Sequence, residues 1–374
     1  MALNQVGLER LNTATTKKIG TNKNLIINGA MQVAQRGTSS TDQLYSTVDR
    51  IRAARNSVDE NPTFAQVDVA SGTTPYTSGF RKAFKITNGN QTSGAGSSDV
   101  IAFTYRIEAQ DIANSGWNYT SASSFITLSY WVRSSVAQNF FGRLFTSDGT
   151  TKNFPFQTGS LSANTWTKIT KTIPGHADLQ FDNDNGRGLD IDFIAFRGTD
   201  QTASGVTLDQ WANLDNTART PDQTTTWYTT NDATLEFTGL QLEVGSVATD
   251  FEHKSFAEEL RLCYRYYYHT GENSTDTEYY DDGGGFGMAE STTKVMCGIR
   301  HPVEMRSTPT ITLFDSTDGS GVVTQKGHTH GIVAVANQSG AIGFQRVSHS
   351  GGGTQFQLDG TKPVSFGYRA EAEL

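Results

Sequence analysis

Apolar and polar side chains alternate along much of this chain, which is the pattern of half-buried β-strands. Between residues 124 and 135, four apolar side chains take alternate positions: Ile126, Leu128, Tyr130 and Val132. Phe125, Thr127, Ser129, Trp131 and Arg133 fall on the opposite side. Because successive side chains of a strand point to opposite faces, we expect the first set to face a core and Trp131 to face away from it. Similar patterns predict strands over residues 80–86, 100–107, 125–133, 140–145, 165–173, 189–196 and 235–244.

One segment changes from strand periodicity to helix periodicity. Leu240, Leu242 and Val244 alternate with polar residues, and Ser255 and Glu258 then form the pattern of a helix capping box. Five side chains follow at helical spacing: Phe256, Leu260, Cys263, Tyr264 and Tyr267. This spacing predicts a short helix that packs through one face and joins two β domains.

The predicted elements divide the chain into three parts. Residues 1–24 form an arm in which Leu3, Leu8 and Leu11 would line one side of a short helix for docking onto another protein; a disordered tail is the alternative. Residues 25–254 have closely spaced strands separated by Gly, Ser and Asn turns, which predicts an all-β jelly-roll sandwich. Residues 255–374 contain the helix and a smaller C-terminal β domain, whose edge strand would begin at Pro309.

The composition agrees with a polar, strand-rich protein, and it argues against some classes of binding partner. Of the 374 residues only 18% are charged, and the net charge of −8 includes no basic run, so we expect no nucleic acid partner. No apolar stretch is long enough for membrane insertion, and the first ten residues lack the pattern of a signal peptide. Cys263 and Cys297 both fall among apolar residues, so we expect reduced core thiols.

Several blocks of sequence resemble bacteriophage tail-fibre and related virion proteins. The first is Asn24-Leu-Ile-Ile-Asn-Gly29 with Gln35-Arg-Gly37 and the pair Asp49-Arg50. The second runs from Phe237 through Gly245 and Phe251-Glu252 to Cys263-Tyr-Arg-Tyr-Tyr267. The third lies between Arg300 and Leu313, and includes Met305-Arg306 and Pro309-Thr310. The strand from 124 to 135 is similar to those of carbohydrate-binding-module jelly rolls.

This resemblance implies a virion structural protein that is assembled in the host cytoplasm and is most often a homotrimer. The leading interpretation is a tail fibre or tail-attached appendage that recognises the host surface and binds other virion proteins through its N-terminal arm. One alternative is a capsid decoration or cement protein that stabilises the head shell. A second alternative is a lectin for host glycans.

A host surface glycan would need aromatic platforms with polar neighbours, since sugar C–H faces stack on rings while hydroxyl groups need hydrogen bonds. Three pairs of residues are candidates: Trp131 with Arg133, Trp117 with Tyr119, and Trp227 with Tyr228. Each tryptophan also fits ordinary core packing, so the sequence leaves the location of a sugar surface open.

Ion binding and catalysis have weaker support. Asp182, Asp184 and Asp190 supply oxygen ligands around a Gly-containing turn, but their spacing departs from the EF-hand loop. A solvated turn is the preferred interpretation, with a structural Ca²⁺ as the alternative. His328 and His330 give only two ligands between glycines. Asp190 and Asp192 would share one strand face, as any two residues at this spacing would, and nucleophile-elbow, zinc-protease and phosphate-loop motifs are absent, so we expect no enzyme.

Overall fold

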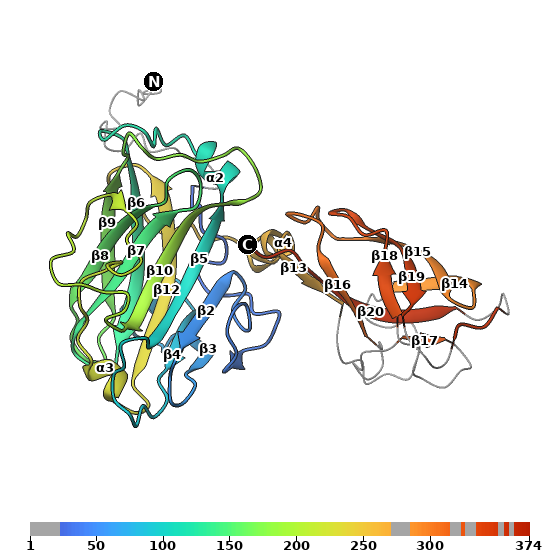
Figure 1. Ribbon diagram of the computed structural model, residues 1–374, viewed down its shortest axis with the longest axis horizontal. Coiled ribbons are helices and arrows are strands. Elements are labelled where there is room, and N and C mark those ends of the chain that lie inside the picture. Colours follow the sequence, from blue (N-terminus) through green and yellow to red (C-terminus); the bar gives the residue numbers. More distant parts are fainter. Residues whose placement is uncertain (1–22, 271–284, 315–322, 326–333, 351–354, 359–362) are drawn as a thin grey trace, which may run out of the picture.

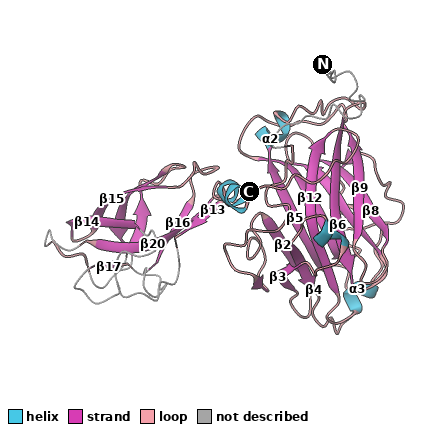
Figure 2. Ribbon diagram, turned by 180° about the vertical axis from the view of Figure 1, so that it is seen from behind, coloured by secondary structure: helices cyan, strands magenta, loops and turns pink. Residues whose placement is uncertain are grey.

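The computed structural model describes residues 23–270, 285–314, 323–325, 334–350, 355–358 and 363–374. Two lobes are visible, a large β-sandwich and a smaller C-terminal β domain, and the C-terminus returns to the junction between them (Figure 1). Strands dominate both lobes and the helices are short (Figure 2). The predicted all-β fold, a jelly-roll sandwich followed by a helix and a smaller β domain, is confirmed.

The sandwich consists of two six-stranded antiparallel sheets. The first sheet contains, in spatial order, β1 (Ser39–Ser40), β3 (Thr63–Asp68), β4 (Lys82–Thr87), β12 (Thr234–Val244), β6 (Phe125–Ser134) and β9 (Thr167–Pro174). The second contains β11 (Ala212–Asn213), β8 (Lys152–Ser160), β7 (Asn139–Thr146), β10 (Arg187–Arg197), β5 (Val100–Glu108) and β2 (Ile51–Asn56). Short helices α1 (Thr74–Thr77), α2 (Ala109–Ala113) and α3 (Thr226–Thr229) lie in the connections.

The main core lies between these two sheets and is rich in aromatic rings. Phe103 of β5 packs against Phe84, Phe193 and Phe237, with ring centres 5.0, 4.7 and 4.9 Å away. The four alternating side chains of β6, from Ile126 to Val132, are all buried as predicted. Aromatic burial of this kind contributes most of the apolar area that a sandwich removes from water.

The C-terminal domain is one eight-stranded sheet organised around β20 (Val364–Glu371). Its other strands are β13 (Tyr267–His269), β14 (Gly285–Ser291), β15 (Lys294–Arg300), β16 (Thr310–Phe314), β17 (Thr324–Gln325), β18 (Ala334–Asn337) and β19 (Gly343–His349). Strand β16 begins directly after Pro309, as predicted, and pairs with β20. Cys263 and Cys297 are buried free thiols, which confirms the expectation for both.

Helix α4 (Phe256–Cys263) lies at the junction of the domains, and two predicted details of it are wrong. The cap forms as predicted, because the Ser255 hydroxyl accepts the backbone N–H of Glu258 at 3.2 Å. The helix buries Glu259 and Cys263, whereas Phe256 is 55% exposed and Tyr267 already belongs to β13. Phe256 is the first residue of the helix, so its side chain extends beyond the surface that the next turn packs against.

Candidate functional site

The outer face of the first sheet carries aromatic and charged side chains together. Trp131 and Arg133 of β6 both point away from the core, as predicted, and each is partly exposed. Arg133 lies opposite Glu236 of β12, and Trp131 lies opposite Lys168 of β9. Trp166, two residues before Lys168, packs with Trp131 against the same small apolar cluster. We call these five residues, Trp131, Arg133, Trp166, Lys168 and Glu236, the Trp131 face.

Polar contacts fix the charged part of the Trp131 face. The Arg133 Nη1 donates to Glu236 Oε1 at 3.1 Å, and its Nε donates to the backbone carbonyl of Asn164 at 3.2 Å. Burial raises the pKa of Glu236, while Arg133 and Lys85 act in the opposite direction. Below the tryptophans, Phe80 and Ala83 are buried and support the rings from behind. The arrangement offers ring faces beside ordered hydrogen-bonding groups, which is what sugar binding requires.

The other two predicted sugar platforms belong mainly to the core. Trp227 and Tyr228 are 0% and 1% exposed, so no sugar can stack on them. The Trp227 indole N–H donates to the Thr234 carbonyl, and the Tyr228 hydroxyl donates to Asp99 at 2.8 Å. Both side chains therefore have internal partners, and this prediction is wrong.

Trp117 and Tyr119 form a third aromatic group at one end of the sandwich. Trp117 is 3% exposed and donates its indole N–H to the Ser124 carbonyl. Tyr119 stays partly exposed, with its ring edge-on to Phe181 at 5.0 Å. Trp117 is therefore a core residue and the predicted platform is wrong for it, while Tyr119 alone retains an accessible surface.

The three predicted calcium ligands do not come together. Asp182 and Asp184 are exposed in the turn before β10, where Asp184 Oδ1 accepts the backbone N–H of Gly186 at 2.8 Å. Asp190 is fully buried on β10 and binds the guanidinium groups of Arg106 and Arg187. Within the described ranges, no group of three or more His, Cys, Asp or Glu side chains is placed to hold a metal ion. Because two arginines already neutralise Asp190, the solvated-turn interpretation agrees with the structure.

Asp190 and Asp192 share the outer face of the second sheet, but arginines occupy both. Asp192 accepts hydrogen bonds from Arg143 at 2.7 Å and from the Thr104 hydroxyl at 2.7 Å. Burial opposes ionisation of Asp192, yet Arg143 and Arg197 outweigh it and lower the pKa. Burial raises the pKa of Asp190, against the effect of its two arginines. These carboxylates serve as partners for arginine side chains, with 0% and 3% of their surface exposed.

The sequence blocks that resemble phage proteins meet at the junction of the two domains. The backbone N–H of Asn28 donates to Glu259 of α4 at 2.6 Å. Arg50 is 1% exposed, lies 3.4 Å from the ring centre of Tyr266, and pairs with Glu373. Arg36 lies in the same way over Tyr267, at 3.5 Å. Residues of the first and second blocks, together with Glu373, therefore build a structural joint.

Two arginines of the C-terminal part, Arg265 and Arg306, complete this joint. Arg265 binds both oxygens of Glu108, at 2.8 and 2.7 Å, and the hydroxyl of Tyr266 donates to the same carboxylate. Arg306 donates to the backbone carbonyls of Asn185, Ala372 and Glu373, at distances of 2.7 to 3.0 Å. The bidentate contact between Arg265 and Glu108 fixes the geometry of the joint as well as contributing energy.

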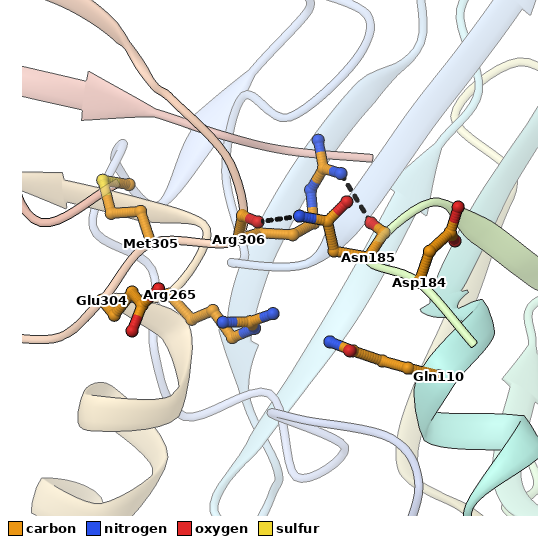
Figure 3. Close-up of a pocket in the computed structure, with 7 residues that line it drawn as sticks. All are labelled: Gln110, Asp184, Asn185, Arg265, Glu304, Met305 and Arg306. Carbon is orange, nitrogen blue, oxygen red and sulfur yellow. Dashed lines mark hydrogen bonds between the residues drawn. The ribbon is translucent and has the colours of Figure 1, made fainter. Parts of the chain in front are cut away.

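A cavity of about 510 Å³ opens beside the joint (Figure 3). Its lining consists of Gln110, Asp184, Asn185, Arg265, Glu304, Met305 and Arg306. Figure 3 shows Asn185 and Arg306 joined by two hydrogen bonds, in which each side chain donates to the backbone carbonyl of the other residue. This lining includes no aromatic ring, and both arginines are engaged by partners in the joint. The Trp131 face is therefore the better candidate for sugar binding.

Some predictions fall on residues outside the described ranges, namely Leu3, Leu8 and Leu11 of the arm and the pair His328 and His330. In the part of the chain that is described, no helix is long and apolar enough to cross a membrane.

No known protein family matches the chain, and no curated protein matches it. Solved structures give weak likenesses. The enzymatically active domain of tailspike protein 4 from bacteriophage CBA120 has a TM-score of 0.31 and 8% identity, covering 60% of this chain and 22% of that chain. A CBM4 structure has a TM-score of 0.30 and 12% identity, covering 58% and 98%. TmCBM61 in complex with β-1,4-galactotriose has a TM-score of 0.26 and 9% identity, covering 60% and 99%.

Trp166, Lys168 and Glu236 belong to the site but were not among the residues predicted from the sequence. A signal for the first two was present, because Trp166 and Lys168 are two residues apart at the start of a predicted strand and so share one face. Which strand lies beside that face depends on pairing between segments distant in sequence, and periodicity alone does not supply this pairing.

Proposed function

We propose that this chain is a glycan-binding structural protein of a bacteriophage particle, carried on the tail and used to contact the host surface. The observation that carries the glycan-binding part is the Trp131 face, where Trp131 and Trp166 present ring surface next to Arg133 and Glu236. The virion part is supported by the sequence blocks that resemble tail-fibre proteins. The same blocks form the joint between the domains, which fits a protein that must hold two domains in a defined orientation.

Binding without catalysis belongs to this proposal. The paired carboxylates Asp190 and Asp192 are occupied by arginines, so they are poorly suited to act as the acid and base of glycoside hydrolysis. Release of reducing ends from a bound polysaccharide would contradict this part of the proposal.

Association into a homotrimer is a further part of the proposal. On the C-terminal sheet, Met288 and Met296 are directly opposed and are 40% and 58% exposed, next to Phe286 at 63%. A continuous apolar group on a soluble surface favours contact with another protein. A second copy of this chain would cover this apolar group, and other virion proteins would bind through the N-terminal arm.

The test of glycan binding is a polysaccharide microarray probed with the intact chain and with Trp131→Ala. We expect retention on a subset of polysaccharides and a loss of about 2- to 10-fold in affinity for the variant, since an aromatic contact contributes about 0.5–1.5 kcal/mol. Tyr76→Ala is a matched control, because this partly exposed ring lies on the same apolar cluster outside the Trp131 face. Equal affinities for the intact chain and Trp131→Ala would contradict the assignment.

The number of copies of this chain per phage particle distinguishes a tail protein from a capsid cement protein. Quantitative mass spectrometry of purified particles should find a small multiple of three copies. Hundreds of copies would instead support a cement protein.

A further inference from the structure

We propose that the Trp131 face selects glycans that carry carboxylate groups, an inference that rests on the glycan-binding role proposed above. Cross-strand pairing places the relevant charges in neighbouring rows. Lys85 of β4, Glu236 of β12 and Arg133 of β6 form one row of directly opposed residues. In the next row, Trp131 of β6 lies opposite Lys168 of β9. The tryptophan ring therefore has cationic side chains in its own row and in the row beside it.

The charges around Trp131 do not cancel. Lys85, Arg133 and Lys168 are three cations, and Glu236 is the one carboxylate among these rows, which leaves two positive charges in excess. The Glu236 carboxylate is already bound by Arg133. Lys168 is exposed, and none of the ion pairs found within the described ranges engages it. Its ammonium group is therefore available to a ligand.

Other carboxylates on the first sheet do not offset this excess. Asp68 pairs with Lys82 at 2.6 Å, on the side of the sheet where β3 and β4 lie. Glu243, farther along β12, accepts the backbone N–H and the hydroxyl of Thr249, both at 2.6 Å. The charge of Asp68 is thus paired with Lys82, while Glu243 is seven residues along β12 from Glu236, roughly 20 Å in an extended strand and beyond a Debye length.

The positive charge around Trp131 contrasts with the negative net charge of the chain, and this contrast would direct an acidic glycan to the Trp131 face. The whole chain carries −8, so an acidic polymer is repelled by most of its surface. A positive group that is close to an anionic ligand acts within a Debye length of about 8 Å at physiological salt, while more distant charges are screened. A sugar stacked on Trp131 would present its ring substituents toward Lys168, which lies in the same row. A carboxylate substituent matches this cation, and Lys85 in the neighbouring row adds to the attraction because Arg133 is already paired with Glu236.

The experiment compares acidic and neutral polysaccharides on one array, and then removes the charge from the ligand. We expect the retained polysaccharides to be carboxylated, and reduction of their carboxylates to primary alcohols to abolish retention. The double variant Lys85→Ala with Lys168→Ala should weaken affinity about 3- to 10-fold, since each exposed charge pair contributes about 0.2–1 kcal/mol. Raising the salt concentration should weaken the intact chain more than the double variant.

Lys294→Ala is the matched control, because Lys294 is also an exposed strand lysine but lies on the C-terminal sheet. Retention of neutral polysaccharides alone, with loss in Trp131→Ala, would overturn the acidic preference and leave glycan binding intact. Retention that survives carboxylate reduction would also overturn it. Failure to retain any polysaccharide would overturn the proposed function itself.

Discussion

At the residue scale, two tryptophans of one sandwich have opposite roles. Trp131 lies in a strand whose alternation predicts its outward direction, and the structure confirms that direction. Trp227 lies in the short helix α3, which has no strand alternation, and it is fully buried. The sequence could therefore predict the accessible platform but not exclude the buried one, because burial of a residue in a connection depends on what packs over it.

The buried tryptophan is expected to matter for stability. Trp227→Ala should lower the free energy of unfolding by about 3–5 kcal/mol, because it leaves a cavity at a fully buried ring. Urea denaturation measures this change. Trp131→Ala serves as the comparison and should cost clearly less, since that ring is partly exposed. Equal losses for the two variants would show that the two sites are not distinguished by burial.

At the element scale, alternation predicted seven strands of the sandwich close to their observed bounds, but it missed β2, β3 and β8 and the two-residue strands β1 and β11. Strand β8 contains Pro155, which usually argues against a strand in a sheet. It is tolerated because only the two-residue strand β11 lies beyond β8 in its sheet. The outward face of β6 was predictable for a different reason, since its apolar set is uninterrupted.

Strand β12 contains an irregularity that single-strand periodicity does not describe. Leu235 and Phe237 face the core before Gly239, whereas Leu240 and Leu242 face it afterwards, so the alternation shifts by one residue. Gly239 has a φ of 66°, in the region that glycine adopts without strain. This bulge keeps both halves of β12 directed into the same core.

Substitution at the bulge should be costly for two reasons. In Gly239→Ala, the new Cβ would lie 2.6 Å from the ring of Phe80, in addition to the backbone strain, so we expect a loss of at least about 2 kcal/mol in the free energy of unfolding. Gly245→Ala is the control, because Gly245 also has a positive φ but has open space around it. Thermal and urea denaturation measure the stability lost in each variant. The control loses only what backbone strain costs, so the difference between the variants is the cost of the collision with Phe80. A loss in Gly239→Ala no larger than in the control would contradict the collision.

At the scale of the whole molecule, the sequence blocks that resemble phage tail-fibre proteins form the joint that connects the two domains. The resemblance could be recognised from the sequence, but its structural meaning could not. Arg50 and Glu373 are more than three hundred residues apart in the chain and meet at a buried ion pair. No local pattern predicts such a contact, because it depends on the C-terminal strand β20 returning to the sandwich.

The joint should give stability a defined dependence on pH. Burial alone would raise the pKa of Glu108, but hydrogen bonds from Arg265 and Tyr266 outweigh it and lower the pKa below its ordinary value of 4.5. Ionised Glu108 therefore contributes stability above about pH 4.5, and this contribution is lost as the pH falls through the lowered pKa. Glu108→Gln should be less stable near neutral pH and should lose less stability on acidification.

Melting temperatures measured from neutral pH down to about pH 3 test this linkage. Asp42→Asn is a suitable control, because Asp42 is an exposed residue far from Glu108 in sequence and none of the described hydrogen bonds or ion pairs engages its carboxylate. Parallel acid profiles for Glu108→Gln and the unmodified protein would contradict the role of Glu108.

The exposed apolar side chains of the C-terminal sheet allow a test of the proposed trimer. Phe286→Ser with Met296→Ser should shift the proposed trimer toward monomer in light scattering, because these changes remove the most exposed apolar groups of that sheet face. Val247→Ser is a control, since Val247 is 62% exposed on the sandwich. A monomeric unmodified protein, or an unchanged mass for the double variant, would contradict this interface.

The most direct test of the central claim is to locate the bound glycan by hydrogen–deuterium exchange. The ligand is the polysaccharide that the array retains best, and exchange is compared with and without it. The account predicts slower exchange in the middle of β6, at the start of β9 and in the first half of β12, around Trp131, Lys168 and Glu236. Protection confined to the joint cavity around Asn185 and Arg306, or to the outer face of the second sheet, would contradict it.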